Sequence, residues 1–383
     1  MTNESLLEKV KSTFLKRFDT KPVLSFSPGR INLIGEHTDY NDGFVFPAAI
    51  NKGIVSGIQK NNAMYCSVYA IDTDEVLEFS LQNIQPIKNG GWKNYVLGVV
   101  AEILKRDKTI YNFDLVFAGN IPLGAGLSSS AALENSVAFG LNELFELGLT
   151  KEEMIYISQQ AEHNYVGVQC GIMDQYASMF GKEGKALLLD CRDLKATYFS
   201  IDFKEYDIVL INTNVKHSLA ESAYNERRSV CETVAKHLEI STLRDATYEV
   251  LFAIKEEINE DHYQKALFII QENERVLKAA IALDKKDYTT FGELLFESHN
   301  GLQNQYNVSC VELDFLIDQA RLNPNILGAR MMGGGFGGCT INIIKKGTAD
   351  AFMNTIAPLY HKQFNKTLSR YDVQIAQGTY KIT

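Results

Sequence analysis

The sequence has 383 residues, of which 45% are hydrophobic, and its 47 acidic and 38 basic side chains leave a formal net charge of −9. The length allows two or three domains with a large core. The negative charge disfavours nucleic acid and anionic membranes as main partners, because both bind basic faces. No stretch approaches 18 consecutive apolar residues, and the first residues lack a basic flank with an apolar run. We therefore expect neither a membrane span nor a secretory signal.

The six cysteines and seven histidines are spread along the chain. They do not form the close pairs that zinc and redox sites use. Thiols spaced in this way are typical of reduced, mostly buried cysteines in a cytoplasmic protein. We expect a cytoplasmic protein that acts as a monomer.

The first half of the chain begins with a helix over residues 4–18 and continues into a strand-rich region. Alternating apolar residues predict strands over 23–26, 31–34, 53–59, 64–69 and 75–79. A helix over 92–105 and a strand over 114–118 follow. The apolar period predicts a long helix over about 129–147. Thr150 and Glu153 then form a capping box for a helix that runs to about Val166.

The second half is more helical. Strands are predicted over 186–212, a charged helix over 219–238, helices through 242–322 and a strand over 340–344. The segment from Val373 to Ile382 is a candidate for one further strand. Strands followed by interleaved helices, without regular alternation, indicate an α+β fold. We expect domains at 1–205 and 206–383, the last strand, from about 373, being free to pack elsewhere.

A polar cluster lies between Pro28 and Tyr40, where Arg30, Glu36, His37 and Asp39 fall close together. A solvated loop is one interpretation of such a cluster. The segment also carries apolar residues typical of a half-buried strand: Ile31, Leu33 and Ile34. The polar residues would then lie where that strand ends, which is a usual place for a site. Carboxylates and an imidazole suit a polyhydroxylated ligand.

A glycine- and serine-rich loop runs from Ile121 to Ala132, between a predicted strand and a predicted helix. Its glycines allow close approach of the backbone to a ligand, and the helix start offers unpaired N–H groups to a phosphate. The alternative is a helix cap with a flexible turn, for which one serine would suffice. The loop is not a Walker A motif, because no Gly-Lys-Ser/Thr follows, and Ser129 stands where a dinucleotide fingerprint has its third glycine.

Two carboxylates are candidates for catalysis. Asp174 lies among apolar residues and glycine, and a partly desolvated aspartate is a candidate general base, although a helix cap is the alternative. Glu162, near the end of its helix, is by itself typical of a solvated or ion-paired residue. Phosphoryl transfer needs a metal carboxylate, a phosphate cradle, a base or orienting group and a cation. Glu162, the 124–130 loop, Asp174 and Arg30 could supply them.

Three motifs in this order resemble those of the galactokinases, which belong to the GHMP small-molecule kinases. The segment Gly29–Tyr40 resembles the galactokinase signature, Pro122–Ala132 the shared ATP-binding motif, and Gly333–Gly338 the third, glycine-rich motif. Two further segments are similar to galactokinases: the stretch 212–232, with Lys216-His217-Ser218, and the stretch 298–313. The resemblance implies an N-terminal domain like domain 2 of ribosomal protein S5, a ferredoxin-like C-terminal domain and an active site between them.

The resemblance also implies ATP-dependent phosphorylation of D-galactose at its C1 hydroxyl, with Mg²⁺. Asp174 would be the base, and Arg30 would stabilise the transition state and hold Asp174 ionised. The sugar would be bound by Glu36, His37, Thr38, Asp39 and Tyr224. ATP would be cradled by Gly124, Ala125, Gly126, Leu127, Ser128, Ser129 and Ser130. The metal would be held by Ser130 and Glu162. Two alternatives are a kinase of a related sugar such as N-acetylgalactosamine and a non-catalytic sensor of galactose and ATP.

Overall fold

The computed structural model describes residues 2–122, 124–215 and 220–383, with the backbone alone at 220–222. Leu123 and the Lys216-His217-Ser218 segment of the sequence analysis lie outside the described residues. No helix in the described part of the chain is long and apolar enough to cross a membrane.

The first sheet has six strands in the order β13-β1-β3-β6-β4-β5. Their bounds are β1 (Val23–Asn32), β3 (Pro47–Lys60), β4 (Cys66–Ala70), β5 (Glu75–Phe79), β6 (Phe113–Gly119) and β13 (Tyr380–Ile382). All neighbours are antiparallel except β4 and β6. The strand predicted over 23–26 and the first half of the strand predicted over 31–34 form one strand, β1, which ends at Asn32. Its register against β3 shifts between Pro28 and Arg30.

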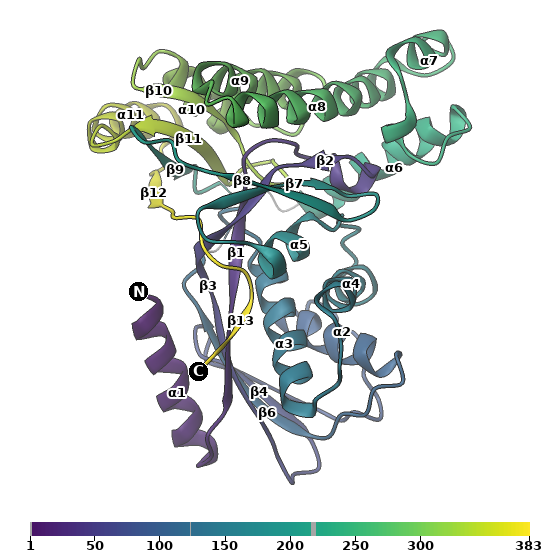
Figure 1. Ribbon diagram of the computed structural model, residues 1–383, viewed down its shortest axis with the longest axis vertical. Helices are drawn as coiled ribbons and strands as arrows, with labels where there is room; N and C mark the ends of the chain where they lie inside the picture. The colour runs from purple at the N-terminus through teal and green to yellow at the C-terminus, as the bar shows by residue number, and fades with distance from the viewer. Residues whose placement is uncertain (1, 123, 216–219) are drawn as a thin grey trace.

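Helices cover both faces of this sheet (Figure 1). On one face lies α1 (Asn3–Phe18), which buries Leu6, Val10 and Phe14 against the strands. The helices of the other face share a larger core with the sheet: α2 (Trp92–Leu104), α3 (Ser129–Phe145), α4 (Lys151–Ala161) and α5 (Met173–Phe180). The capping box of Thr150 and Glu153 is confirmed, but α4 ends at Ala161 and continues as a π-helical turn, η2 (Glu162–Val166).

The rest of the chain forms two smaller sheets and a helical layer. The three-stranded sheet contains β2 (Phe44–Val45), β7 (Lys185–Asp190) and β8 (Lys195–Ser200). The four-stranded sheet, in the order β10-β11-β9-β12, contains β9 (Tyr206–Asn212), β10 (Ile326–Met331), β11 (Cys339–Lys345) and β12 (Ser369–Asp372). The helices are α6 (Ala220–His237), α7 (Tyr248–Ala253), α8 (Glu260–Asp284), α9 (Tyr288–Asn304), α10 (Val311–Arg321) and α11 (Ala349–Phe364). Short 3-10 turns are η1 (Asp39–Asn41) and η3 (Leu243–Asp245).

Three elements of this second half escaped the sequence analysis: β10, β12 and α11. β10 contains a glycine and an arginine, Gly328 and Arg330, that interrupt its apolar pattern. α11 carries Pro358 within the helix, a residue that usually marks a helix end. In both elements tertiary packing outweighs the local signal.

Candidate active site

A cavity of about 430 Å³ opens between the six-stranded sheet with its helices and the second half of the chain. Segments far apart in the sequence line it. They supply Arg30, Glu36, His37 and Asp39, the loop residues 124–130, then Glu162, Cys170, Gly171 and Asp174, and finally Tyr224 and residues 333–336. The structure therefore brings together every site residue predicted from the sequence except Thr38. The hydroxyl of Thr38 faces the carbonyl of Phe44 at 2.6 Å, and its side chain is buried away from the cavity lining.

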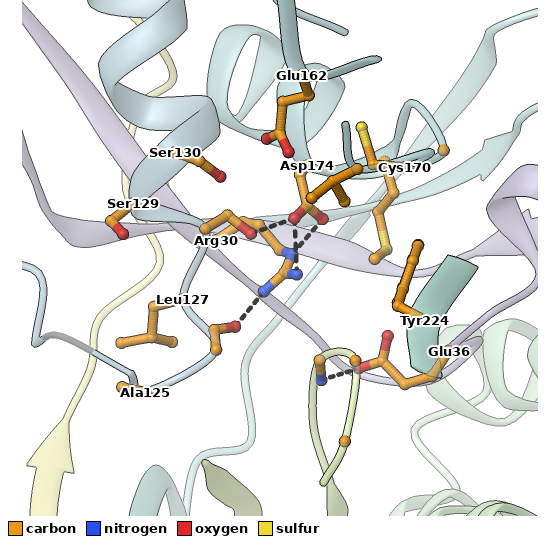
Figure 2. A pocket seen from close by; sticks show the side chains of 18 of the residues that line it. Arg30, Glu36, Ala125, Leu127, Ser129, Ser130, Glu162, Cys170, Asp174 and Tyr224 are labelled. Atoms are coloured by element: carbon orange, nitrogen blue, oxygen red, sulfur yellow. Dashed lines mark hydrogen bonds and ion pairs between the residues drawn. The ribbon is translucent and has the colours of Figure 1, made fainter. Parts of the chain in front are cut away.

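Arg30 and Asp174 form the centre of the cavity (Figure 2). Arg30 Nε donates to Asp174 Oδ1 at 2.7 Å and Nη2 donates to Oδ2 at 3.0 Å, a two-point ion pair. The third nitrogen, Nη1, donates to the carbonyl of Gly126 at 2.6 Å. Burial alone would lower the pKa of Arg30, but the charges of Asp174 and Glu36 raise it above its ordinary value. Arg30 thus connects the aspartate to the glycine-rich loop.

Close backbone contact explains why the loop reaches Arg30. A Cβ on Gly29 would lie 2.5 Å from the carbonyl of Leu127, so only glycine lets β1 approach the loop here. The same contact brings the backbone N–H of Arg30 within 3.2 Å of that carbonyl. The glycine at the register shift of β1 therefore positions the loop as well as the strand.

The start of α3 faces the cavity without a side-chain cap. Ser128 stands at the N-cap with φ +57, and its hydroxyl donates to Asp174 Oδ2 at 2.5 Å instead of capping the helix. The helix start retains its positive dipole end, with Ser129 and Ser130 lining the cavity beside it. The alternative, in which the serines serve only as a helix cap, is wrong for Ser128.

The polar cluster of the first motif is buried. Arg30, Glu36, His37 and Asp39 are each at most 8% exposed, so the solvated-loop interpretation is wrong. A Cβ on Gly171 would lie 2.0 Å from Asp39 Oδ2, which explains a glycine at this point of the wall.

Glu36 is the most constrained member of this cluster. Its Oε1 accepts from Arg330 Nη2 at 3.0 Å and from the backbone N–H of Gly333 at 2.8 Å, and its Oε2 accepts from Asn32 at 3.0 Å. Burial would raise the pKa of Glu36, but Arg330, followed by Arg30, holds it below its ordinary value. The carboxylate is thus an ionised acceptor at the cavity wall.

His37 and Asp39 differ from Glu36 because their charged forms are disfavoured. Burial lowers the pKa of His37 to about 4, so the ring is neutral near pH 7. Its Nδ1 pairs with the Tyr40 hydroxyl at 2.8 Å, whereas its Nε2 has no hydrogen-bond partner among the described residues. Burial and then the nearby charge of Asp174 raise the pKa of Asp39 to about 7. Both groups can bond to a neutral hydroxylated ligand.

Tyr224 closes the wall from α6. Its ring lies 5.4 Å from that of His37, and burial raises its pKa. Two hydrogen bonds attach this helix to Gln169 in the neighbouring loop. Asn225 accepts from the backbone N–H of Gln169 at 2.9 Å, and Arg228 donates to the carbonyl of Gln169 at 3.1 Å. The loop leading to α5 and Asp174 is thereby fixed to the element that carries Tyr224.

The two carboxylates on the helical side of the cavity, Asp174 and Glu162, lie in settings that differ from the alternatives considered for them in the sequence. Asp174 is the second residue of α5, after the N-cap Ile172 and Met173, so the cap interpretation is wrong. Glu162 is 6% exposed, and Gln175 Nε2 lies 3.5 Å from its Oε1, so the solvated interpretation is wrong as well. In Figure 2 the side chains of Ser130 and Glu162 lie on the same side of the Arg30–Asp174 pair.

Comparison with known proteins agrees with the three motifs. Residues 12–60 match the galactokinase galactose-binding signature, 94–182 the N-terminal domain of GHMP kinases, and 279–360 their C-terminal domain. A galactokinase of Clostridium acetobutylicum is 40% identical over 98% of this chain and 98% of its own length. The chain belongs to the galactokinase family. A galactokinase of Thermotoga maritima is also 40% identical, over 93% of this chain and 99% of its own length.

Solved structures support the same family and fold. The crystal structure of Lactococcus lactis galactokinase complexed with galactose is 36% identical and matches with a TM-score of 0.94 over 98% of this chain and 100% of that chain. The mevalonate kinase of Methanococcus jannaschii, at 16% identity and a TM-score of 0.66 over 93% of this chain and 99% of that chain, shares the fold. The expectation of a two-domain α+β fold is confirmed.

Sequence reasoning missed Arg330, which contacts Glu36 although 294 residues separate them. A signal was available: one charged residue lies in an otherwise apolar strand, directly before the glycine motif at 333–338. An arginine in that setting must find buried acceptors, and a nearby site carboxylate is one such acceptor.

Proposed function

We propose that this protein transfers the terminal phosphoryl group of ATP to the C1 hydroxyl of D-galactose, giving galactose 1-phosphate and ADP. The single observation that carries the proposal is the position of the Arg30–Asp174 pair. It lies between the serine-rich start of α3 on one side and the Glu36, His37 and Asp39 wall on the other, within one cavity. A phosphate donor and a hydroxylated acceptor would meet at this pair.

The sugar is assigned to the wall formed by Glu36, His37, Asp39 and Tyr224. A carboxylate that is already ionised, a neutral imidazole and a carboxyl that titrates near neutrality together offer both acceptors and donors. Buried polar groups of this kind discriminate strongly, because a sugar with a missing or inverted hydroxyl leaves them unpaired. Thr38 is assigned to the support of this loop and not to the sugar.

ATP is assigned to residues 124–130 and to the start of α3. Gly124 and Gly126 have positive φ, which lets the loop curl toward a ligand without a Cβ in the way. The unpaired N–H groups and positive end of the helix favour phosphate oxygens. Ser129 and Ser130 add hydroxyl donors beside them.

The residues at this end of the cavity fit Mg²⁺. The donors are one hydroxyl, from Ser130, and one carboxylate, from Glu162, and the described residues contain no cluster of three His, Cys, Asp or Glu that could form an all-protein metal cage. Mg²⁺ typically takes one or two carboxylates and completes its shell with substrate phosphates and water. When bound, it would supply positive charge to the phosphates.

The chain's own groups then divide the chemistry. Asp174 accepts the proton of the sugar's C1 hydroxyl or orients that hydroxyl toward the phosphorus. Arg30 holds the Asp174 carboxylate at two points, and its positive charge lies where negative charge develops on the transferred group. Ser128 gives Asp174 a further hydrogen bond, which restricts the carboxylate to one orientation.

An ADP-release assay with a panel of sugars tests this function. We expect turnover with galactose and ATP that requires Mg²⁺, and little turnover with glucose. Turnover that favours N-acetylgalactosamine over galactose would assign a related sugar kinase instead. Binding of galactose without any ADP release would favour a sensor.

The proposal also covers the domain division and the state of the protein in the cell. We propose that the two domains divide between residues 205 and 206, after β8 and at the start of β9. We further propose that the protein acts as a monomer in the cytoplasm, without nucleic acid or membrane partners. Sedimentation of the purified protein tests the monomer.

A further inference from the structure

Arg330 is a fully buried arginine at the contact between the two halves of the protein. It lies on β10 of the four-stranded sheet and is 0% exposed. Its Nε donates to the carbonyl of Leu33 at 2.7 Å, and its Nη2 donates to the carbonyl of Asn32 at 2.6 Å. Both acceptors belong to the end of β1 and the loop after it. The guanidinium therefore joins the second sheet to the segment that carries the polar cluster.

The same Nη2 also donates to Glu36 Oε1 at 3.0 Å, while Nη1 donates to the carbonyl of Met331 at 2.6 Å. Every nitrogen of the fork thus has an acceptor. A lysine has the charge but not this planar fork, so it cannot bond to these acceptors together. The arrangement requires arginine by geometry and not by charge alone.

Glu36 depends on this contact for its orientation. Arg330 and the Gly333 N–H bond to one of its oxygens, Oε1, and Asn32 bonds to the other, which leaves one lone pair of Oε2 for a ligand in the cavity that Glu36 lines. Gly333 belongs to the third motif, so that motif and β10 hold the carboxylate together. In Figure 2 Glu36 and Glu162 lie on opposite sides of the Arg30–Asp174 pair.

We propose that Arg330 is a positioning residue that determines sugar selectivity by holding the Glu36 carboxylate against one hydroxyl of the substrate. This inference rests on the proposed function, because it takes galactose as the ligand of that wall. It gives β10 a role in recognising the sugar, although none of the side chains of this strand lines the cavity. Breaking a buried ion pair also destabilises a fold, so the test must separate an effect on sugar selectivity from an effect on stability.

The first arm compares Arg330→Lys with wild type in kinetics for each substrate. We expect the KM for galactose to rise by about tenfold or more, as for loss of a charged hydrogen bond, while the KM for ATP stays within about twofold. Arg244→Lys is the matched control. Arg244 also pairs with a carboxylate, Asp190 at 3.1 Å, and donates to a loop carbonyl, that of Asp42 at 3.1 Å, but it does not line the cavity.

The second arm uses monodeoxygalactoses. In wild type, removing the one hydroxyl that Glu36 accepts should weaken binding most. In Arg330→Lys this penalty should shrink, while penalties at other positions persist. A purely structural role would lower stability or weaken every sugar alike. An unchanged pattern of penalties in a folded variant would overturn the inference.

The third arm covers failure of the single variant to fold. A double variant, Glu36→Gln with Arg330→Gln, leaves neither charge of this pair without its partner. It should therefore fold more readily than a variant that loses Arg330 alone. If Arg330 acts through Glu36, the double variant has the same galactose affinity as Glu36→Gln alone. A further loss in the double variant would contradict the inference. Absence of galactose turnover by wild type would instead refute the proposed function, so the two failures are distinguishable.

Discussion

Three carboxylates of the cavity differ in their cationic partners. Asp174 is held by Arg30 at two points, and Glu36 is held by Arg330. Asp39 has no ion pair in the part of the chain that the structure describes, and it lies close enough to Asp174 to sense its charge. The same side-chain chemistry therefore yields a fixed acceptor at Glu36, a guanidinium-bound carboxylate at Asp174 and a titratable group at Asp39.

Substituting Asp174 by asparagine tests the assigned base. Asp174→Asn keeps the size of the side chain but removes its proton acceptor, so kcat should fall by about 100-fold or more. Galactose affinity, measured by calorimetry, should change little, because the sugar is assigned mainly to Glu36, His37, Asp39 and Tyr224. Circular dichroism controls for folding. Near-wild-type turnover in a folded Asp174→Asn protein would show that another group accepts the proton.

Substituting Asp39 by asparagine tests the pH dependence of stability. The pKa of Asp39 is about 7 in the folded protein and 3.8 in a model compound. As pH rises between these values, the unfolded chain loses its proton first, so this group destabilises the fold progressively, by at most about 1.4 kcal/mol per pH unit. Above about pH 7 both states are ionised and the effect is constant.

Asp39→Asn lacks this ionisation. In urea titrations, the free energy of unfolding of the variant minus that of wild type should therefore increase as the pH rises toward about 7. Above that pH the difference should stay constant. The relevant comparison is between the two proteins at each pH, which cancels the titration of other groups. A difference that does not vary with pH would contradict the raised pKa.

At the scale of elements, helix starts are used in two different ways. α4 is closed by a local capping box, in which the side chains of Thr150 and Glu153 bond to each other's backbone N–H groups. α3 has no side-chain cap, and its serine at the N-cap points to Asp174 instead. The capping box satisfies backbone N–H groups at the start of α4, whereas those at the start of α3 are left for a ligand.

Thr150→Ala should therefore affect stability and not catalysis. Loss of the capping bond should lower the free energy of unfolding by about 1 kcal/mol, while kcat stays within about twofold because Thr150 is at the far end of α4 from Glu162. Urea unfolding and the ADP-release assay measure the two effects. Thr348→Ala is the control, since Thr348 is the N-cap of α11 but makes no side-chain capping bond. Equal losses for the two variants would count against the capping role.

At the scale of the whole molecule, the end of the chain returns to the first sheet. β13 pairs with β1, and the Thr379 hydroxyl lies 2.8 Å from that of Ser27 and 3.0 Å from the carbonyl of Ser178 on α5. Lys151 also donates to the carbonyl of Thr379 at 3.1 Å. The C-terminal residues thus fasten α5, the helix that carries Asp174, to the sheet.

Deleting residues 379–383 should lower the free energy of unfolding by at least about 1–3 kcal/mol, because the buried Ser27 and Ser178 groups lose a partner. Thermal and urea unfolding measure the change. Deleting Thr383 alone is the matched control, since it lies after β13. A truncated protein as stable as the control would show that the returning strand is dispensable.

The sequence by itself determined those features whose signals lie within a few residues of one another. These are the helical period of α1, α2 and α3, the capping box at Thr150, and the three motifs that indicate the family. Each depends on local backbone geometry or on a short run of residue types, so no knowledge of distant contacts is needed.

Tertiary structure decided the geometry in which distant charges meet. The pairing of Arg30 with Asp174 joins residues 144 apart, and that of Glu36 with Arg330 joins residues 294 apart. Such contacts depend on strand register and on how the two halves pack, which single-residue patterns do not encode. For the same reason β10 was missed, and the sequence did not reveal that the hydroxyl of Thr38 bonds to the carbonyl of Phe44.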